Sequence, residues 1–220
     1  MSYIISLKIK PETHQHFLEI HQQLNAGTTE SLAKPLGDNL ADIACEIIDQ
    51  VFGDIAKMSK SDDHESEKII QQILDTTRKY MPWSVSFFGN DRLKPMVNYL
   101  YDLTSEKEGT FLMSYPVEQS VVTELLNCVD QMKACNDTYV PAALKAFTEI
   151  VDQGVTHLIR EPKKILKFNL VVDKTLNGII HVTTQLGYRR FEKLGTLYDA
   201  KSMSGFFDHF LGFLKNKSDL

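Results

Sequence analysis

The chain has 220 residues and a formal net charge of −5, with 43% hydrophobic and 24% charged residues. This length fits one large domain or two small ones, and the composition is ordinary for a soluble globular protein. No apolar run approaches the roughly 20 residues that a transmembrane helix needs. We therefore expect no membrane span, and the N-terminus lacks the features of a signal peptide, so we expect a cytoplasmic protein.

The cysteines support that expectation. Cys45, Cys128 and Cys135 are odd in number and widely spaced, which argues against a disulfide framework. Cys45 and Cys128 fall in apolar helical patterns, where a free cysteine behaves as a small hydrophobe. We expect thiols that pack in the core.

Helical periodicity dominates the rest of the chain, with apolar residues at steps of three and four. Pro11 suits a helix start, and Asn25-Ala26-Gly27 is typical of a helix end. Further apolar stripes predict helices over 40–58, 69–80, 91–103, 116–132, 140–158 and 203–214.

Residues 79–90 interrupt this pattern with a proline, a glycine and a concentration of aromatic side chains. Trp83, Phe87 and Phe88 are the candidate ligand-binding or partner-binding residues of the chain. They are typical of an apolar pocket or of a protein interface, although aromatic residues at a helix break also fill cores.

Residues 104–116 indicate a linker or a short extended piece, because Glu108-Gly109-Thr110 breaks the helical pattern. We expect one helical domain over 1–220, with a possible subdivision near 104–116.

The segment 165–190 fits two structures. Its apolar residues lie at helical spacing, but they also alternate as in strands on both sides of Asn177-Gly178, a favoured tight-turn pair. A lone hairpin is marginally stable. The other strand candidates, Ile5-Leu7-Ile9, Val85-Phe87 and Phe111-Met113, are weak, so a long helix is the preferred interpretation.

The last predicted helix is rich in phenylalanine. Phe206, Phe207, Phe210 and Phe213 are candidates for the seam of a homodimer, or they dock the helix onto its own domain. A membrane-surface helix would carry more lysine and arginine on its polar face.

The motifs of several enzyme classes are absent. The chain has no Glu-x-x-His, His-Glu-x-x-His or Cys-x-x-Cys pattern, no phosphate-binding glycine loop and no Gly-x-Ser-x-Gly. We assign no catalytic residue, metal ligand or cofactor. Residues 160–193 are modestly basic, but the chain is acidic overall, so no clear nucleic-acid binding is expected.

These observations predict a mainly all-α bundle of about seven to eight helices, or an α+β fold if the hairpin in 165–190 forms. For function they leave three hypotheses. The first is a non-enzymatic interaction or regulatory module, with a homodimer or another protein as its partner. The second is a helical binding protein with an apolar pocket near Trp83. The third is an unrecognised enzyme that uses histidines such as His14, His21, His157 and His181 with carboxylates from different helices.

Overall fold

The protein is mainly helical, as the apolar periodicity predicts. The computed structural model describes residues 2–58 and 64–217. Its helices are α1 (Pro11–Ala26), α2 (Ala33–Met58), α3 (Glu65–Val85), α4 (Asn90–Tyr101), α5 (Gln119–Lys133), α6 (Val140–Val155), α7 (Glu161–Leu166), α8 (Leu170–Leu197) and α9 (Ala200–Leu211), with a 3-10 turn η1 (Asp137–Tyr139) and a π-helical segment η2 (Thr156–Arg160).

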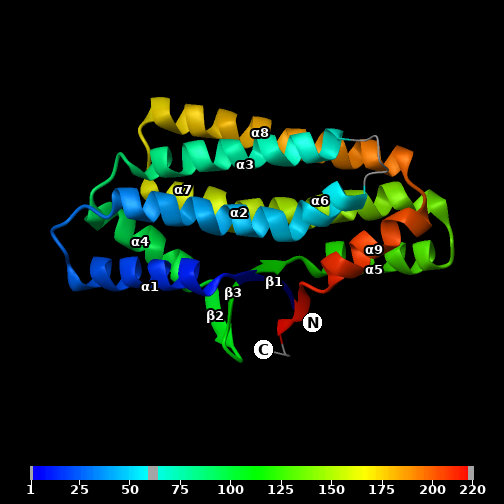
Figure 1. Cartoon of the computed structure of the whole chain (residues 1–220), viewed down its shortest axis with the longest axis horizontal. Coiled ribbons are helices and arrows are strands. Elements are labelled where there is room, and N and C mark those ends of the chain that lie inside the picture. Colours follow the sequence, from blue (N-terminus) through cyan, green and yellow to red (C-terminus); the bar gives the residue numbers. More distant parts are fainter. Residues whose placement is uncertain (1, 59–63, 218–220) are drawn as a thin grey trace.

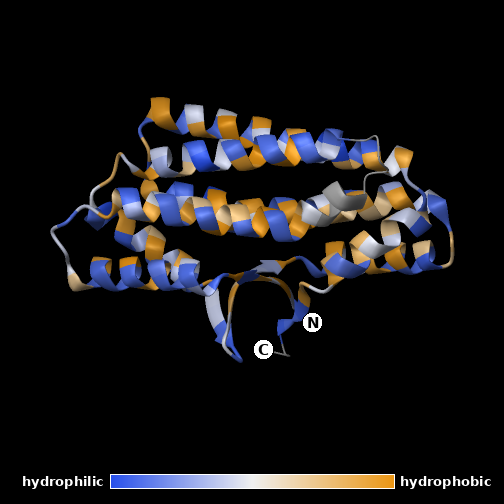
Figure 2. Cartoon of the chain, in the orientation of Figure 1, coloured by the Kyte–Doolittle hydropathy of each residue, from blue (hydrophilic) through white to orange (hydrophobic). Residues whose placement is uncertain are grey.

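The helices lie in three layers (Figure 1). Helices α3 and α8 form the outermost layer, and α2, α6 and α7 lie beneath them. The third layer holds α1, α4, α5 and α9, with a small sheet between them. Hydropathy follows this arrangement in the lower layers, where apolar faces turn toward one another (Figure 2).

The sheet has four antiparallel strands in the order β2-β3-β1-β4. Strand β1 (Tyr3–Ile9) pairs with β3 (Thr110–Val117) on one side and with β4 (Leu214–Asn216) on the other. Strand β2 (Thr104–Lys107) forms a hairpin with β3. The segment 104–116, predicted as a linker or a short extended piece, is therefore largely this extended hairpin.

Two of the weak strand candidates are neighbours in this sheet, where Leu7 pairs with Met113 and Ile9 pairs with Phe111. The third, Val85-Phe87, is wrong, because α3 continues through Pro82 and ends at Val85. A proline removes one backbone donor from a helix, and Pro82 lies in the last turn of α3, which ends three residues later at Val85.

The preferred helical interpretation of 165–190 is confirmed, and the hairpin alternative is wrong. Asn177-Gly178 lies inside α8, where Leu176, Phe191 and Leu194 are buried on one side. A break separates α7 from α8 at Lys167, which adopts a left-handed conformation, and the Asn169 side chain caps α8.

Two groups of buried apolar side chains form the core. One surrounds Phe147 of α6, and the other surrounds Phe17 of α1 together with α4. Ile47 of α2 and Leu158 of η2 pack against both groups. The two cores thus meet beneath α3 and α8.

The phenylalanines of α9 belong to the first core. The rings of Phe206, Phe207 and Phe210 lie 5.0, 6.5 and 4.7 Å from that of Phe147, and all three are buried. Phe213 is half-buried beside them. Because the chain itself covers Phe206, Phe207 and Phe210, these side chains dock α9 onto its own domain. Their role as the seam of a homodimer stays a prediction.

Candidate ligand cavity

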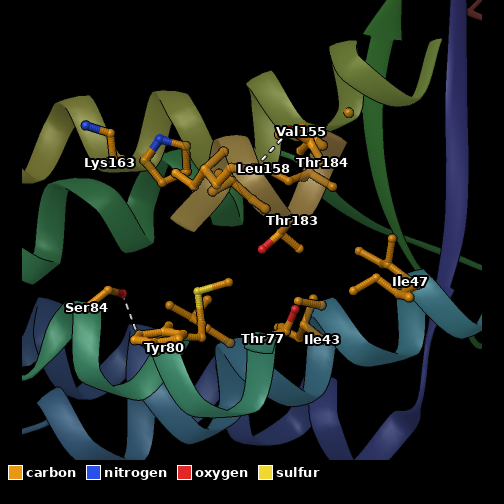
Figure 3. A pocket seen from close by; sticks show the side chains of 18 of the residues that line it. Ile43, Ile47, Thr77, Tyr80, Ser84, Val155, Leu158, Lys163, Thr183 and Thr184 are labelled. Atoms are coloured by element: carbon orange, nitrogen blue, oxygen red, sulfur yellow. Dashed lines mark hydrogen bonds between the residues drawn. The ribbon is translucent and has the colours of Figure 1, made fainter. Parts of the chain in front are cut away.

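A cavity of about 240 Å³ lies where the two cores meet (Figure 3). Helix α3 and the N-terminal half of α8 bound it on the outer side, and α2, the end of α6 and η2 bound it on the inner side. Strands β1 and β3 contribute Leu7, Met113 and Tyr115. Segments far apart in the chain therefore line one pocket, which is partly open to solvent.

The walls are almost entirely aliphatic and aromatic. Among the lining side chains are Ile43 and Ile47 of α2, Tyr80 and Met81 of α3, Val155, Leu158 and Ile159 of the α6–η2 segment, and Ile179, Ile180 and Thr183 of α8. In Figure 3, the side chain of Thr183 points into the space between α8 and α2.

The π-helical segment η2 places Leu158 and Ile159 on the cavity wall. It interrupts an otherwise continuous run of helix from α6 to α7. A π-helical turn winds the backbone more widely than an α-helical turn and is frequent at functional sites. Here it joins α6 to α7 along the wall.

Arg160 of η2 anchors this turn. Its guanidinium donates to both oxygens of Asp152, at 2.8 Å each, and the Tyr188 hydroxyl of α8 donates to Asp152 at 2.7 Å. The hydrogen bonds from Arg160 lower the pKa of Asp152, whereas burial raises the pKa of Tyr188. This cluster fixes α8 against the inner wall of the cavity.

A close approach at Gly154 shapes the sheet side. A Cβ on Gly154 would lie 2.8 Å from the Tyr115 ring and hydroxyl. Tyr115 is buried, which raises the pKa of its phenol. Only a residue without a side chain at position 154 lets this ring pack under α6.

The hydroxyl groups of the walls are mostly satisfied within their own helices. Thr77 donates to the Ile73 carbonyl oxygen, Thr184 to Ile180 and Ser84 to Met81. They therefore add little polar surface to the cavity. A dry, apolar interior is the expected state of such a space.

Lys163 is the charged side chain among the described lining residues. It lies at one end of the cavity in Figure 3, its side chain is 13% exposed, and its ammonium pairs with the Asp173 carboxylate of α8. This ion pair therefore lies at one end of an otherwise apolar pocket.

The predicted aromatic residues adjoin the cavity, but none lines it. Trp83 is half-buried, with its ring 6.1 Å from that of Tyr80 and 5.0 Å from that of Phe87. Phe87 is 51% exposed. Phe88 is buried and packs edge-on against Phe168, which does line the cavity.

Sequence reasoning thus found the neighbourhood and missed the wall residues. One signal for them was available. The predicted helix over 165–190 is apolar at more positions than one buried face needs, which indicates contact on two sides.

The histidines of the enzyme hypothesis do not meet. His14 and His21 lie on α1, where their rings stack on Phe111 and Tyr101. His157 is in η2, and His181 is exposed on α8. In residues 2–58 and 64–217, no group of three or more histidine, cysteine or acidic side chains could hold a metal ion.

No protein-family model, curated protein or solved structure matches this chain. In the part of the chain that the structure describes, no helix is both long and apolar enough to cross a membrane.

Proposed function

We propose that the chain is a binding protein for a small apolar molecule or a short single-chain amphiphile. The observation that supports this proposal is the cavity between α2, α3, the α6–η2 segment and α8, with its aliphatic and aromatic walls. Well-packed proteins leave few apolar spaces larger than a water molecule between their elements, so a partly open pocket of this size with apolar walls needs a reason.

Its size fits a ligand of modest length. The volume of about 240 Å³ exceeds the roughly 150 Å³ of an apolar cavity that binds benzene. It lies just below the range in which drug-sized ligands commonly bind, which starts near about 300 Å³. Water gains little in such a space because it finds few hydrogen-bond partners, whereas an apolar ligand restores the missing packing.

Lys163 and Asp173 orient the ligand in this proposal. The pair lies at one end of the cavity, so an amphiphile places its polar group there and its chain among Ile43, Ile180 and Leu158. An alcohol or an acid both offer an oxygen to the Lys163 ammonium. A polar group elsewhere in the cavity would meet mostly hydrocarbon and lose its hydrogen bonds.

We prefer this function to the interaction module that the sequence alone suggested, because an interaction module does not need such a cavity. Among the described residues that line the cavity, histidines and carboxylates do not come together as the enzyme hypothesis requires.

The first experiment is native mass spectrometry of the full chain purified from its own source, followed by solvent extraction and identification of any released molecule. The second is titration with the neutral apolar fluorophore N-phenyl-1-naphthylamine. We expect a saturable site with one probe per chain.

A matched pair of variants locates the site. Thr183→Phe places a ring in the cavity, whereas Thr196→Phe places the same ring on an exposed turn of the same helix. We expect Thr183→Phe to weaken probe binding at least about tenfold, or about 1.4 kcal/mol, without lowering Tm, because the ring fills an existing void. Equal binding by wild type and both variants would overturn the proposal.

A further inference from the structure

Helix α8 carries apolar side chains on two faces. Its inner face lines the cavity with Leu176, Ile179 and Ile180. Its outer face also presents aliphatic side chains to solvent, with Val171 74%, Val182 59% and Leu186 38% exposed. A helix that only covers a core presents polar residues outward, so the outer face needs a separate explanation.

These exposed residues lie on one line. Val171, Thr175, Gly178, Val182 and Leu186 follow each other at steps of four, three, four and four, which keeps them on one face of a helix. We call them the outer stripe.

The described part of the chain leaves the outer stripe open. A Cβ added to Gly178, at its middle, would meet no atom within 4 Å. Helix α8 is the outermost element in Figure 1, and Figure 2 shows apolar residues repeated along it. Leu170, at the start of the helix, adds a side chain that is 69% exposed.

The exposed charged side chains beside the outer stripe are mainly basic, with the acidic Glu192 following beyond its C-terminal end. Lys174 and Arg189 are exposed on α8, and Lys167 is exposed just before it. Asp173 is the acidic residue between Leu170 and Arg189, and its carboxylate pairs with Lys163 and accepts from Asn177. An apolar stripe with basic flanks suits a partner that is apolar and anionic.

We propose that the outer stripe docks onto an anionic lipid bilayer, with α8 lying in the plane of the headgroups. Aliphatic side chains enter the boundary between headgroups and acyl chains, while neighbouring lysine and arginine side chains contact the lipid phosphates. A second copy packed through the same stripe fits less well, since it would bring Lys174 and Arg189 of the two copies together. The outer stripe also lacks the aromatic anchors that dominate most protein interfaces.

Docking through α8 brings the cavity next to the bilayer. The inference that ligand then moves between the two rests on the proposed function. The same helix separates the bilayer from the cavity, so an apolar ligand passes between them beside α8 without crossing much water. The cavity then holds the ligand, and the outer stripe holds the protein at the bilayer with which the ligand is exchanged.

The test is co-sedimentation of the full chain with vesicles. One set contains phosphatidylglycerol and phosphatidylcholine in equal parts, and the other contains phosphatidylcholine alone. We expect binding to the anionic vesicles, weaker binding to the neutral ones, and a loss with added salt because the charges are exposed.

Three variants separate the contributions of the apolar and the charged side chains to vesicle binding. Val171→Ser combined with Val182→Ser removes exposed apolar groups, so we expect at least roughly tenfold weaker partitioning, with Tm and binding of N-phenyl-1-naphthylamine unchanged. Lys174→Glu is expected to weaken binding to anionic vesicles only. Tyr139→Ser, which changes an exposed aromatic residue of η1, is the control and should bind like wild type.

Equal vesicle binding by wild type and the double variant would overturn the docking proposal, and so would a wild-type dimer that dissociates when Val182 is changed. If vesicles do not bind but the fluorophore does, docking fails and the proposed function stands. If vesicles bind but the fluorophore does not, the proposed function fails and docking stands.

Discussion

Gly37 of α2 and Pro82 of α3 are in direct backbone contact. A Cβ on Gly37 would lie 2.6 Å from the Pro82 Cα and 2.9 Å from a methyl carbon of Val85. Since Pro82 is backbone-constrained and Val85 is buried, neither can move aside cheaply. This contact sets the spacing of α2 and α3, and thereby the position of Tyr80 and Met81 on the cavity wall.

The first prediction follows from that contact. Gly37→Ala should destabilise the protein by about 1–3 kcal/mol, because the added methyl group overpacks the helix crossing. Gly53→Ala in the same helix is the matched control, since its nearest neighbour is the flexible Asp49 side chain. Alanine there should stabilise by about 0.5–1 kcal/mol through helix propensity. The free energy of unfolding of both variants is measured with urea. A Gly37→Ala variant as stable as wild type would show that α2 and α3 can move apart to admit the methyl group.

The helices were predictable because their signals are local. The stripe from Leu40 to Val51 and the start at Pro11 each follow from residues within a few turns. Segment 165–190 was ambiguous because its residues satisfy both periods. Burial of Leu176 and Phe191, with the cap at Asn169, selects the helix.

The sheet and the cavity were not predictable in the same way. Ile5 pairs with Tyr115 and with Leu214, so β1 depends on partners more than a hundred residues away. The cavity is the space that several packed helices leave between them, and no local pattern encodes a space. The aromatic cluster around Trp83 was the most visible feature of the sequence, yet it packs beside the wall.

The second prediction separates Tyr80 from Trp83. Tyr80 lines the cavity and Trp83 does not. Tyr80→Ala should therefore weaken binding of N-phenyl-1-naphthylamine by roughly tenfold, because a ring is lost from the wall. Trp83→Phe should bind it like wild type. Since the two rings are 6.1 Å apart, Trp83 emission in the wild-type protein should still change when ligand binds. If Trp83→Phe weakened binding more than Tyr80→Ala, the ligand would bind at Trp83, as the sequence predicted.

The third prediction concerns pH. His14 is buried against Phe111, and its Nδ1 has no hydrogen-bond partner among residues 2–58 and 64–217. Burial lowers its pKa from the ordinary value of 6.5, although the nearby Glu106 opposes this. Below pH 6.5 the unfolded state takes up a proton more readily than the folded state, so the free energy of unfolding should fall as pH drops from 7.5 to about 5.

His14→Phe tests this directly, because the ring keeps its stack on Phe111 but cannot take up a proton. Its stability relative to wild type should increase toward pH 5, as measured by urea midpoints at several pH values. His21→Phe, which alters the other stacked pair on α1, controls for the effect of replacing a stacked imidazole by a phenyl ring. Parallel profiles for wild type and His14→Phe would assign the acid sensitivity to other groups.

The fourth prediction addresses the start of α8, which borders both the cavity and the outer stripe. The Asn169 side chain accepts hydrogen bonds from the backbone amides of Val171 and Val172, at 3.1 and 3.0 Å. Asn169→Ala removes this cap and should cost about 1 kcal/mol. Because the chain turns sharply at Lys167, the first turn of α8 has little other support on its outer side, so the loss should appear there first.

Hydrogen exchange should then show faster exchange at the N-terminal amides of α8 than at its C-terminal amides, where Arg190 bonds to Glu65 and Ser66 of α3. A bound ligand should dissociate faster from Asn169→Ala than from wild type, because that end of α8 covers the cavity. Asp199→Ala, which removes the cap of α9, should cost similar stability without changing ligand release. Equal release rates in the two variants would show that ligand leaves by another side of the cavity.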